Sequence, residues 1–253
     1  EGARFDPAMM SSGVLTGKFD KEKMLQSTDK KGITFGEALE ESGFKGDESN
    51  RLKEATAFIE LHIEQGPVLE SEQKDIGVVE GVVGMVNYEI TVKGESNHAG
   101  TFPMKHRRDA LFVATDLIHT LKNELSTIDE ELVYTIGRVN VYPNIHTVVP
   151  NQVSFTLESR HKDPKVIEKV EKIIHSLPEE SGGCFVRFEK LWSRETVHFD
   201  ETIVNTIETV CNDYGYSSRR MYSGAGHDAQ FIASIIPTAM IFVPSVDGRS
   251  HCE

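Results

Sequence analysis

Residues 88–125 decide the fold, because a strand pattern, Tyr-Glu-Ile-Thr-Val (88–92), precedes a helical one, Ala-Leu-Phe-Val-Ala-Thr-Asp-Leu-Ile-His-Thr-Leu-Lys-Asn-Glu-Leu (110–125). Apolar residues recur in the second stretch at intervals of three and four, which aligns them along one face of a helix. They are Ala110, Val113, Ala114, Leu117, Ile118, Leu121 and Leu125. We predict a helix over 105–125.

The chain continues outward from this pair with the same alternation of strands and helices. Residues 133–141 and 152–160 alternate as strands, and a second amphipathic helix follows Asp163-Pro164, an N-cap and a first-turn proline. Residues 184–191 close the unit as a strand. This β-α-β-β-α-β order predicts a small two-layer α+β sandwich over 84–196.

The residues on either side of the sandwich carry the parts of a second domain. Residues 57–65, Ala-Phe-Ile-Glu-Leu-His-Ile-Glu-Gln, alternate as a strand that holds His62 and its glutamate neighbours on one face. Residues 197–253 contain a helix, a glycine-rich turn and an apolar strand. Because 1–83 and 197–253 each look incomplete alone, we predict one domain that is interrupted by the sandwich at 84–196.

The composition argues against several classes of protein. Of 253 residues, 40 are acidic and 27 are Lys or Arg, so the formal net charge is −13. Binding to nucleic acid or to an anionic membrane needs basic patches, which this balance disfavours. No run approaches the roughly 20 apolar residues of a membrane helix. Three widely spaced cysteines without a CxxC pair favour reduced thiols and a cytoplasmic protein.

Three histidines are candidates for chemistry. His62 is either a half-buried strand residue paired with Glu60 or Glu64, or a metal ligand, since neutral imidazole binds divalent zinc. His98, in Ser-Asn-His-Ala-Gly-Thr, either caps the following helix or donates to a substrate oxyanion. His251 follows a buried strand, where ligands collect in open α/β sheets, although most histidines near a terminus bind nothing.

Two further features are suited to an anion. The turn Ser-Gly-Ala-Gly-His-Asp (223–228) precedes a short helix, and its small residues would let a ligand approach the backbone closely. A plain tight turn is the alternative. Arg160 ends a strand, and its planar guanidinium matches a substrate carboxylate, with a surface salt bridge as the alternative.

Five motifs in a fixed order resemble one known family. They are LHIEQGPVLE, NHAGTFPMKHRRDA, PNIHTVVP, SGAGHDA and FVPSVDGRSH. Together they are similar to the amidase/hydantoinase/carbamoylase family of metal-dependent amidohydrolases over nearly the whole chain. The resemblance implies an α/β fold, with a two-zinc aminopeptidase-like catalytic domain, incomplete in this chain, and an inserted lid domain that also forms a homodimer. It also implies two divalent ions per complete subunit, which could be zinc, manganese, cobalt or nickel.

The resemblance assigns roles to individual residues by motif. It makes Glu1, His62 and His251 metal ligands. It makes His98 the lid histidine that stabilises the oxyanion, usually in the site of the partner subunit. The substrate-binding positions that it implies are Gln65, Thr147, Arg160, Gly224, Ala225 and Gly226, with Arg160 on the substrate carboxylate.

The chain departs from the family pattern at its start and at two motif positions. The remaining metal ligands and the general base would lie before Glu1, so we expect an N-terminally truncated chain. Thr147 stands where the family usually has Asn, and Phe102 stands where Thr is commoner. These two differences concern the identity of the substrate more than the class of reaction.

The implied reaction is hydrolysis of a carbamoyl or ureido C–N bond in a small carboxylate molecule, first of all an N-carbamoyl-L-amino acid. Hydrolysis of allantoate or ureidoglycolate is the alternative within enzymes. A protein of another class, an inactive chain that serves as a dimerisation or ligand-binding module, is the third hypothesis.

Overall fold

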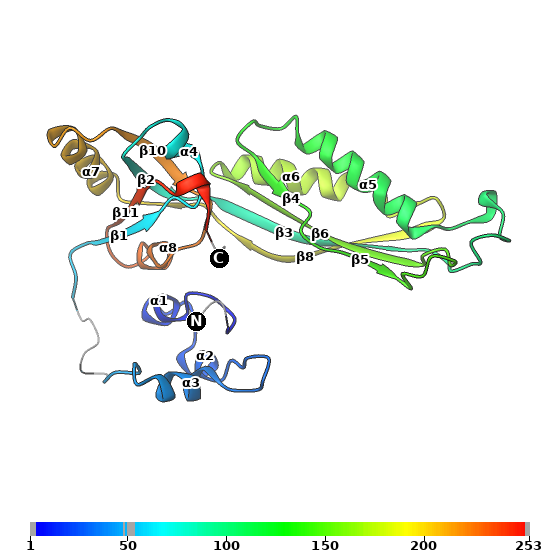
Figure 1. Ribbon diagram of the computed structural model, residues 1–253, viewed down its shortest axis with the longest axis horizontal. Helices are drawn as coiled ribbons and strands as arrows, with labels where there is room; N and C mark the ends of the chain where they lie inside the picture. The colour runs from blue at the N-terminus through cyan, green and yellow to red at the C-terminus, as the bar shows by residue number, and fades with distance from the viewer. Residues whose placement is uncertain (1–3, 48, 50–53, 251–253) are drawn as a thin grey trace. The chain divides into compact units, whose positions relative to one another are not determined.

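The computed structural model describes residues 4–47, 49 and 54–250 of the chain (Figure 1). The chain divides into two compact units. Residues 1–82 and 197–253 form the flanking unit, and residues 83–196 form the inserted unit.

The flanking unit is built on a mixed sheet with the order β1-β11-β2-β10, in which β9 also pairs with β2. Its strands are β1 (Phe58–Ile63), β2 (Ile76–Val82), β9 (Val197–His198), β10 (Ser218–Ser223) and β11 (Thr238–Val243). Strands β1 and β11 are parallel, with His62 beside Phe242 in register. The carboxyl ends of both strands therefore lie at the same edge of the sheet.

Helices α7 (Glu201–Asp213) and α8 (Asp228–Ile232) pack on this sheet, and α4 (Val68–Ser71) contacts the 3-10 turn η3 (Val246–Gly248). The first three helices are α1 (Met10–Leu15), which contacts α8, and α2 (Lys21–Leu25) and α3 (Phe35–Ser42), which contact each other. Asp200 caps α7 by accepting a hydrogen bond from the amide of Ile203, as its type and position favour. Val204 and Ile207 of this helix join Met240 and Phe242 of β11 in one buried cluster.

Strand β1 has the reverse of the usual burial pattern. Its apolar residues Ile59, Leu61 and Ile63 are exposed, at 52%, 67% and 40%. Glu60 and His62, on the other face, are half-buried. The polar side chains of this strand therefore face the protein, where they meet α8 and the turn before it.

The inserted unit is an antiparallel sheet with the order β4-β6-β3-β8-β7, in which β5 also pairs with β6. Its strands are β3 (Gly84–Lys93), β4 (Val133–Thr135), β5 (Val139–Tyr142), β6 (Gln152–His161), β7 (Glu180–Ser181) and β8 (Cys184–Arg194). Helices α5 (Ala110–Leu125) and α6 (Pro164–Ser176) lie on the same side of it (Figure 1). Side chains from β3, such as Val86 and Ile90, pack against Leu121 and Ile174 of the two helices. The predicted α/β fold class is confirmed.

The first helix of the inserted unit begins five residues later than the predicted 105–125, at Ala110. The side chain of Asp109 accepts hydrogen bonds from the amides of Leu111 and Phe112, which makes it the N-cap. Before it, residues Met104–His106 form the 3-10 turn η2, and Arg107 donates to the carbonyl oxygens of Ala99 and Phe102. The spacing of apolar residues does not predict these hydrogen bonds.

The predicted strand over 133–141 is interrupted. Residues 133–135 and 139–142 form separate strands, and both pair with β6. Between them the carbonyl of Arg138 still accepts a hydrogen bond from the amide of Thr156, so the segment stays beside β6 without regular pairing.

No helix in the described ranges is long and apolar enough to cross a lipid bilayer. Cys184 and Cys211 are buried free thiols, and burial raises the pKa of each above its usual value. Cys252 lies outside the described residues.

Candidate functional site

His62 stands near the carboxyl end of β1, and its ring is held in one tautomer. Its Nδ1 lies 2.9 Å from the carbonyl oxygen of Ile63. A carbonyl oxygen only accepts, so Nδ1 carries the proton and donates it. In the neutral ring this leaves the lone pair on Nε2, the form in which a histidine binds a metal ion while a backbone carbonyl orients it. The pairing with Glu60 or Glu64 that was the alternative is absent from the hydrogen bonds of His62.

A buried histidine, His227, packs against His62. The two rings lie edge to face with centroids 4.7 Å apart, and the other side of His227 meets Phe242 at 5.7 Å. The Nε2 atom of His227 is 2.8 Å from the Ser223 hydroxyl oxygen, and Nδ1 is 3.7 Å from Glu60. His227 therefore packs against the His62 ring and restricts its position.

Glu60 connects this cluster to α8. Its carboxylate accepts a hydrogen bond of 2.8 Å from the amide of Ala229, in the first turn of that helix. Burial raises the pKa of Glu60 above its usual value, while the bond from Ala229 opposes the rise. Glu64 has a separate task, since it accepts from the amides of Val68 and Leu69 and so caps α4.

Gln65 follows β1 in a left-handed backbone conformation, with φ of 60°. Non-glycine residues rarely adopt this region, and strain of this kind collects at functional sites. Its amide donates to the hydroxyl of Ser245, 2.9 Å away, in the loop after β11.

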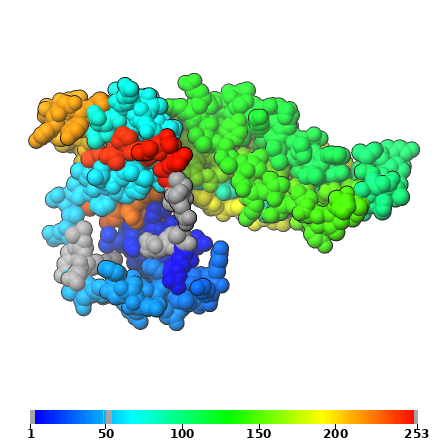
Figure 2. All heavy atoms as spheres, viewed as in Figure 1, coloured from blue at the N-terminus to red at the C-terminus, as the bar shows by residue number. Residues whose placement is uncertain are grey.

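The loop after β11 packs directly on the end of β1. A Cβ atom on Gly248 would lie 2.9 Å from the nitrogen of Pro67, so the two backbones are in close contact. In Figure 2 the red atoms of this loop lie against cyan atoms of the β1–β2 region. The loop leads to His251, which lies outside the described residues, as does Glu1.

The glycine-rich turn before α8 is closed by Ser223, whose hydroxyl bonds the amide and the carbonyl of Ala225. A Cβ atom on Gly224 would meet no other atom within 4 Å, so packing does not require glycine there. This leaves room above Gly224, and the close ligand approach to Gly224, Ala225 and Gly226 stays a prediction. Helix α8, which follows this turn, has five residues.

His98 lies in the loop beyond the far end of β3, in the inserted unit, and is also held in one tautomer. Its Nδ1 accepts hydrogen bonds from the amides of Gly100 and Thr101, at 3.0 and 3.2 Å. In the neutral ring the proton is therefore on Nε2, and the exposed ring can donate it. His98 does not cap α5, whose cap is Asp109.

Thr147 lies beside this loop. Its carbonyl accepts a hydrogen bond of 2.9 Å from the amide of Ala99, and the next residue, Val148, forms a bridge with His98. The structure thus brings the predicted site residues His98 and Thr147 together.

Arg160 lies at the opposite end of the inserted sheet, near the last residue of β6. Its Nε and Nη2 both donate to one oxygen of Glu158, with Nε 2.8 Å away. The salt bridge weighed as an alternative is therefore present. Strands β3 and β6 have ten residues each, which separates Arg160 from the His98 loop by roughly 30 Å at 3.3 Å per residue.

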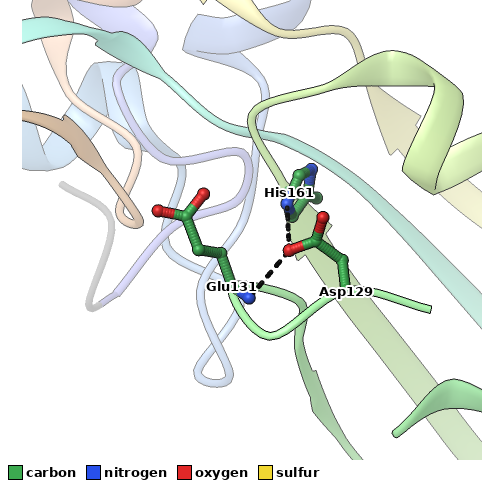
Figure 3. A group of neighbouring side chains, drawn as sticks. All are labelled: Asp129, Glu131 and His161. Carbon is green, nitrogen blue, oxygen red and sulfur yellow. Dashed lines mark hydrogen bonds and ion pairs between the residues drawn. The ribbon is translucent and has the colours of Figure 1, made fainter. Parts of the chain in front are cut away.

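The described residues contain one further group with metal-binding atoms, Asp129, Glu131 and His161 (Figure 3). The amide of Asp163 donates to His161 Nδ1, 2.9 Å away, so the proton of the neutral ring is on Nε2. Nε2 lies 3.3 Å from Asp129, an ion-pair distance without hydrogen-bond geometry. Because Nε2 carries a proton, it offers no lone pair to a metal ion, and we interpret the group as a polar corner before α6.

A shallow hollow on α6 contains none of the predicted site residues. Its lining includes Tyr88, Glu171, His175 and Lys190. The Tyr88 hydroxyl donates to Glu171 at 3.0 Å, and Lys190 pairs with the same carboxylate. Burial, with help from Glu171, raises the pKa of Tyr88 to about 12. The network satisfies a buried phenol and needs no ligand.

Sequence reasoning named Glu60 only as a partner of His62 and missed its contact with His227, and it missed Glu158. Glu158 and Arg160 are two residues apart on a strand, a spacing that places both side chains on one face and could have revealed the pair. No comparable signal joins Glu60 to His227, which lie 167 positions apart and meet only in the folded chain.

Comparison with known proteins identifies the family. Residues 23–253 match Peptidase family M20/M25/M40. The allantoate amidohydrolase of Escherichia coli (strain K12) is 37% identical over 259 residues, and the N-carbamoyl-L-amino-acid amidohydrolase of Rhizobium meliloti is 35% identical over 258 residues. These alignments cover 99% and 100% of this chain but 62% of each relative. The chain thus spans less than two thirds of the length of these proteins.

Solved structures agree with the sequence relatives. An amidase of the hydantoinase/carbamoylase family from Burkholderia multivorans has a TM-score of 0.90 and 39% identity, covering 100% of this chain and 62% of that one. A hydantoinase/carbamoylase family amidase from Burkholderia ambifaria has a TM-score of 0.87 and 33% identity, covering 99% and 62%. By its sequence and its fold, this chain belongs to peptidase family M20/M25/M40, and its fold is that of the hydantoinase/carbamoylase amidases.

Proposed function

We propose that this chain is part of a metal-dependent amidohydrolase that cleaves the C–N bond of a carbamoyl or ureido group in a small carboxylate substrate. N-carbamoyl-L-amino acids are the first candidates, as in the relative from Rhizobium meliloti. The domain assignment belongs to the same proposal, with the flanking unit as the catalytic part and the inserted unit as the lid.

The observation that carries the proposal is the tautomer of His62. The carbonyl of Ile63 holds the Nδ1 proton, so Nε2 has the lone pair that a divalent ion needs. Two groups converge on the same edge of the sheet, the strained Gln65 and the loop that leads to His251. A structural histidine such as His161 can share a fixed tautomer, but it would not need this convergence.

The free Nε2 of His62 fits a divalent metal ion, and by motif we assign Glu1 and His251 as further ligands in this chain. Imidazole and carboxylate groups suit zinc, manganese, cobalt or nickel alike. When bound, a pair of such ions would supply an activated water and polarise the scissile carbonyl.

Residues of the inserted unit would act on the substrate itself. His98, with its proton on Nε2, donates to the oxygen on which negative charge develops. Arg160 binds the substrate carboxylate through its planar fork, after part of its bond to Glu158 is given up. Thr147, beside His98, and Gln65 with the Gly224–Gly226 turn complete the proposed substrate contacts.

The separation of Arg160 and His98 favours a site shared by two chains. A small carboxylate cannot span the roughly 30 Å between the two ends of the inserted sheet. The two residues therefore act on different substrate molecules, and each site takes them from different copies. This supports a homodimer formed through the inserted unit.

Allantoate is the second candidate substrate, because the relative from Escherichia coli is named for it at a similar identity. A non-catalytic dimerisation or ligand-binding module is the third reading. Such a module would share the fold but would not need His62 and His98 in these tautomers.

The test compares this chain with a version extended upstream to the length of its relatives. Elemental analysis of both, with side-by-side assays on N-carbamoyl amino acids and allantoate, should find about two divalent ions per chain and hydrolysis in the extended version alone. His62→Ala should lose metal and activity together. His119→Ala, which changes an exposed histidine of α5, is the control. An extended protein that holds no metal would remove the proposal and favour the binding module.

A further inference from the structure

The buried ring of His227 lies against the rings of two neighbouring strands. Its centroid is 4.7 Å from that of His62 on β1, with the planes inclined at 67°, and 5.7 Å from that of Phe242 on β11. His62 and Phe242 are partners in the parallel register, so their side chains share one face of the sheet. His227, which is 4% exposed, therefore packs on that face against both strands at once.

Contacts that do not involve His62 hold His227 in place. The residue stands directly before α8 in an extended backbone conformation, and its side chain does not cap that helix. Its Nε2 lies 2.8 Å from the hydroxyl oxygen of Ser223, which is itself buried. Its Nδ1 lies 3.7 Å from Glu60, whose carboxylate accepts a hydrogen bond from the amide of Ala229. The ring therefore offers a fixed surface to His62.

His62 itself is held less completely. Within the part of the chain that the structure describes, its one hydrogen bond runs from Nδ1 to the carbonyl oxygen of Ile63. This bond fixes the tautomer, but it restrains one atom and leaves the plane of the ring free to turn about it. The edge-to-face contact with His227 supplies the missing restraint, at a centroid distance that is usual for aromatic pairs. The direction of the Nε2 lone pair therefore depends on His227.

The two histidines are suited to different tasks. Nε2 of His227 faces the Ser223 hydroxyl at hydrogen-bond distance, and almost none of the ring is exposed. His62 is half-buried, and its Nε2 makes no hydrogen bond among the described residues. A metal ligand must offer a free lone pair, which this arrangement gives to His62 and not to His227.

We propose that His227 is a positioning residue for His62: its ring fixes the plane of the His62 imidazole, and with it the direction in which Nε2 presents its lone pair to a divalent ion. This role rests on the proposed function, in which His62 is a metal ligand. Loss of a group that orients a ligand typically lowers metal affinity by about tenfold to a hundredfold. The nitrogen atoms of His227 seat the ring, and the ring orients His62.

Zinc affinity of the full-length protein, measured by competition with a chromogenic chelator, separates the ring of His227 from its hydrogen bond. His227→Ala removes both, and His227→Gln keeps a polar partner for Ser223 without a ring, so each should weaken zinc binding by about tenfold to a hundredfold. His227→Phe keeps a ring, so it should bind zinc within about threefold of the parent. Its stability should still fall, because it loses the hydrogen bond to Ser223.

His198→Ala is the matched control. His198 is an exposed histidine of the same unit, and its ring also packs edge to face, on Tyr222 at 5.9 Å. Its loss should leave zinc affinity unchanged. Thermal unfolding of every variant identifies loss of fold. If the Phe variant does not fold, His227→Gln carries the test through the second readout.

The second readout needs no metal. Long-range proton–nitrogen correlation spectra of the metal-free protein, isotope-labelled at histidine and recorded at about pH 8 where imidazole is neutral, report which nitrogen of His62 carries the proton. His62→Gln assigns the signals. The parent should show a protonated Nδ1 and a free Nε2. In His227→Gln the two nitrogen shifts should move toward each other, because a ring that turns freely exchanges tautomers, and His227→Phe should resemble the parent.

The role is overturned if His227→Ala and His227→Gln bind zinc as tightly as the parent. It is also overturned if His227→Gln retains binding that His227→Phe loses, which would assign the effect to the hydrogen bond. If a folded His227→Phe binds as little zinc as His62→Ala, His227 is itself a ligand and the positioning role is wrong.

The two levels of the proposal fail separately. If the parent binds no zinc, the proposed function fails, and the nitrogen shifts of His62 still decide the positioning role. If the parent binds zinc and hydrolyses its substrate while neither readout depends on the ring of His227, the proposed function stands and this inference fails.

Discussion

At the scale of single residues, backbone groups hold two histidines in opposite tautomers. The carbonyl of Ile63 accepts a hydrogen bond from Nδ1 of His62, which leaves a lone pair on Nε2. The amides of Gly100 and Thr101 donate to Nδ1 of His98, which leaves a proton on Nε2. The first tautomer suits the metal ligand that we propose, and the second suits the oxyanion donor that we propose.

His98→Ala in the full-length protein should lower kcat by about a hundredfold to a thousandfold, the usual cost of one lost oxyanion donor. Metal content should not change, because His98 is not one of the proposed metal ligands. Steady-state kinetics and elemental analysis test this. A variant that loses metal would contradict the role.

Ser223→Ala should destabilise the flanking unit by about 1–3 kcal/mol, since it leaves the buried Nε2 of His227 without the hydroxyl 2.8 Å away. Urea unfolding of this chain gives the value. Ser234→Ala, at an exposed residue whose hydroxyl bonds only the preceding turn, is the control and should change stability by less than about 0.5 kcal/mol. Equal losses in both variants would show that the Ser223 contact contributes nothing.

At the scale of elements, the inserted unit shows how far the spacing of apolar residues predicts helices and strands. The order of strands and helices follows from periodicity, because each element must bury an apolar face. The start of α5 does not, because it is set by the side-chain cap at Asp109, while the bonds from Arg107 hold the loop before it. The spacing of apolar residues reports neither contact.

Leu121→Ala should cost about 2–5 kcal/mol of stability, because Leu121 is buried in the core of the inserted unit at 1% exposure. Leu111, on the same helix, is 37% exposed, and Leu111→Ala should cost much less. Denaturant titration followed by circular dichroism compares them. A loss at position 111 that matches that at 121 would contradict the assigned orientation of α5.

At the scale of the whole molecule, acidic side chains tie stability to pH. The hydrogen bond from Arg220 holds the pKa of Glu208 below its usual value, and the bond from Ser217 does the same for Asp75. A carboxyl whose folded pKa is lowered stabilises the fold above its ordinary pKa. That contribution is lost as the pH falls through the folded pKa.

The thermal midpoint of this chain should therefore fall as the pH is lowered from 5 to 3. Glu208→Gln removes one such group, so the variant should be less stable than the parent near pH 6, and the gap should narrow toward pH 3. The pair with Arg220 is partly exposed, so the difference near pH 6 should not exceed about 3 °C. Differential scanning calorimetry at several pH values tests this, and a gap that stays constant would contradict it.

The sequence by itself determined the α/β class, the order of elements from 84 to 196, and the family, because periodic burial and ordered motifs are local properties of the chain. The local backbone conformation of the fold decided which nitrogen of His62 and of His98 carries the proton, through groups one to three residues away. Tertiary structure alone brought His227 to Glu60 and Arg194 level with Arg160. These two pairings join residues far apart in the chain, and they form only when the sheets pair and the loops close on them.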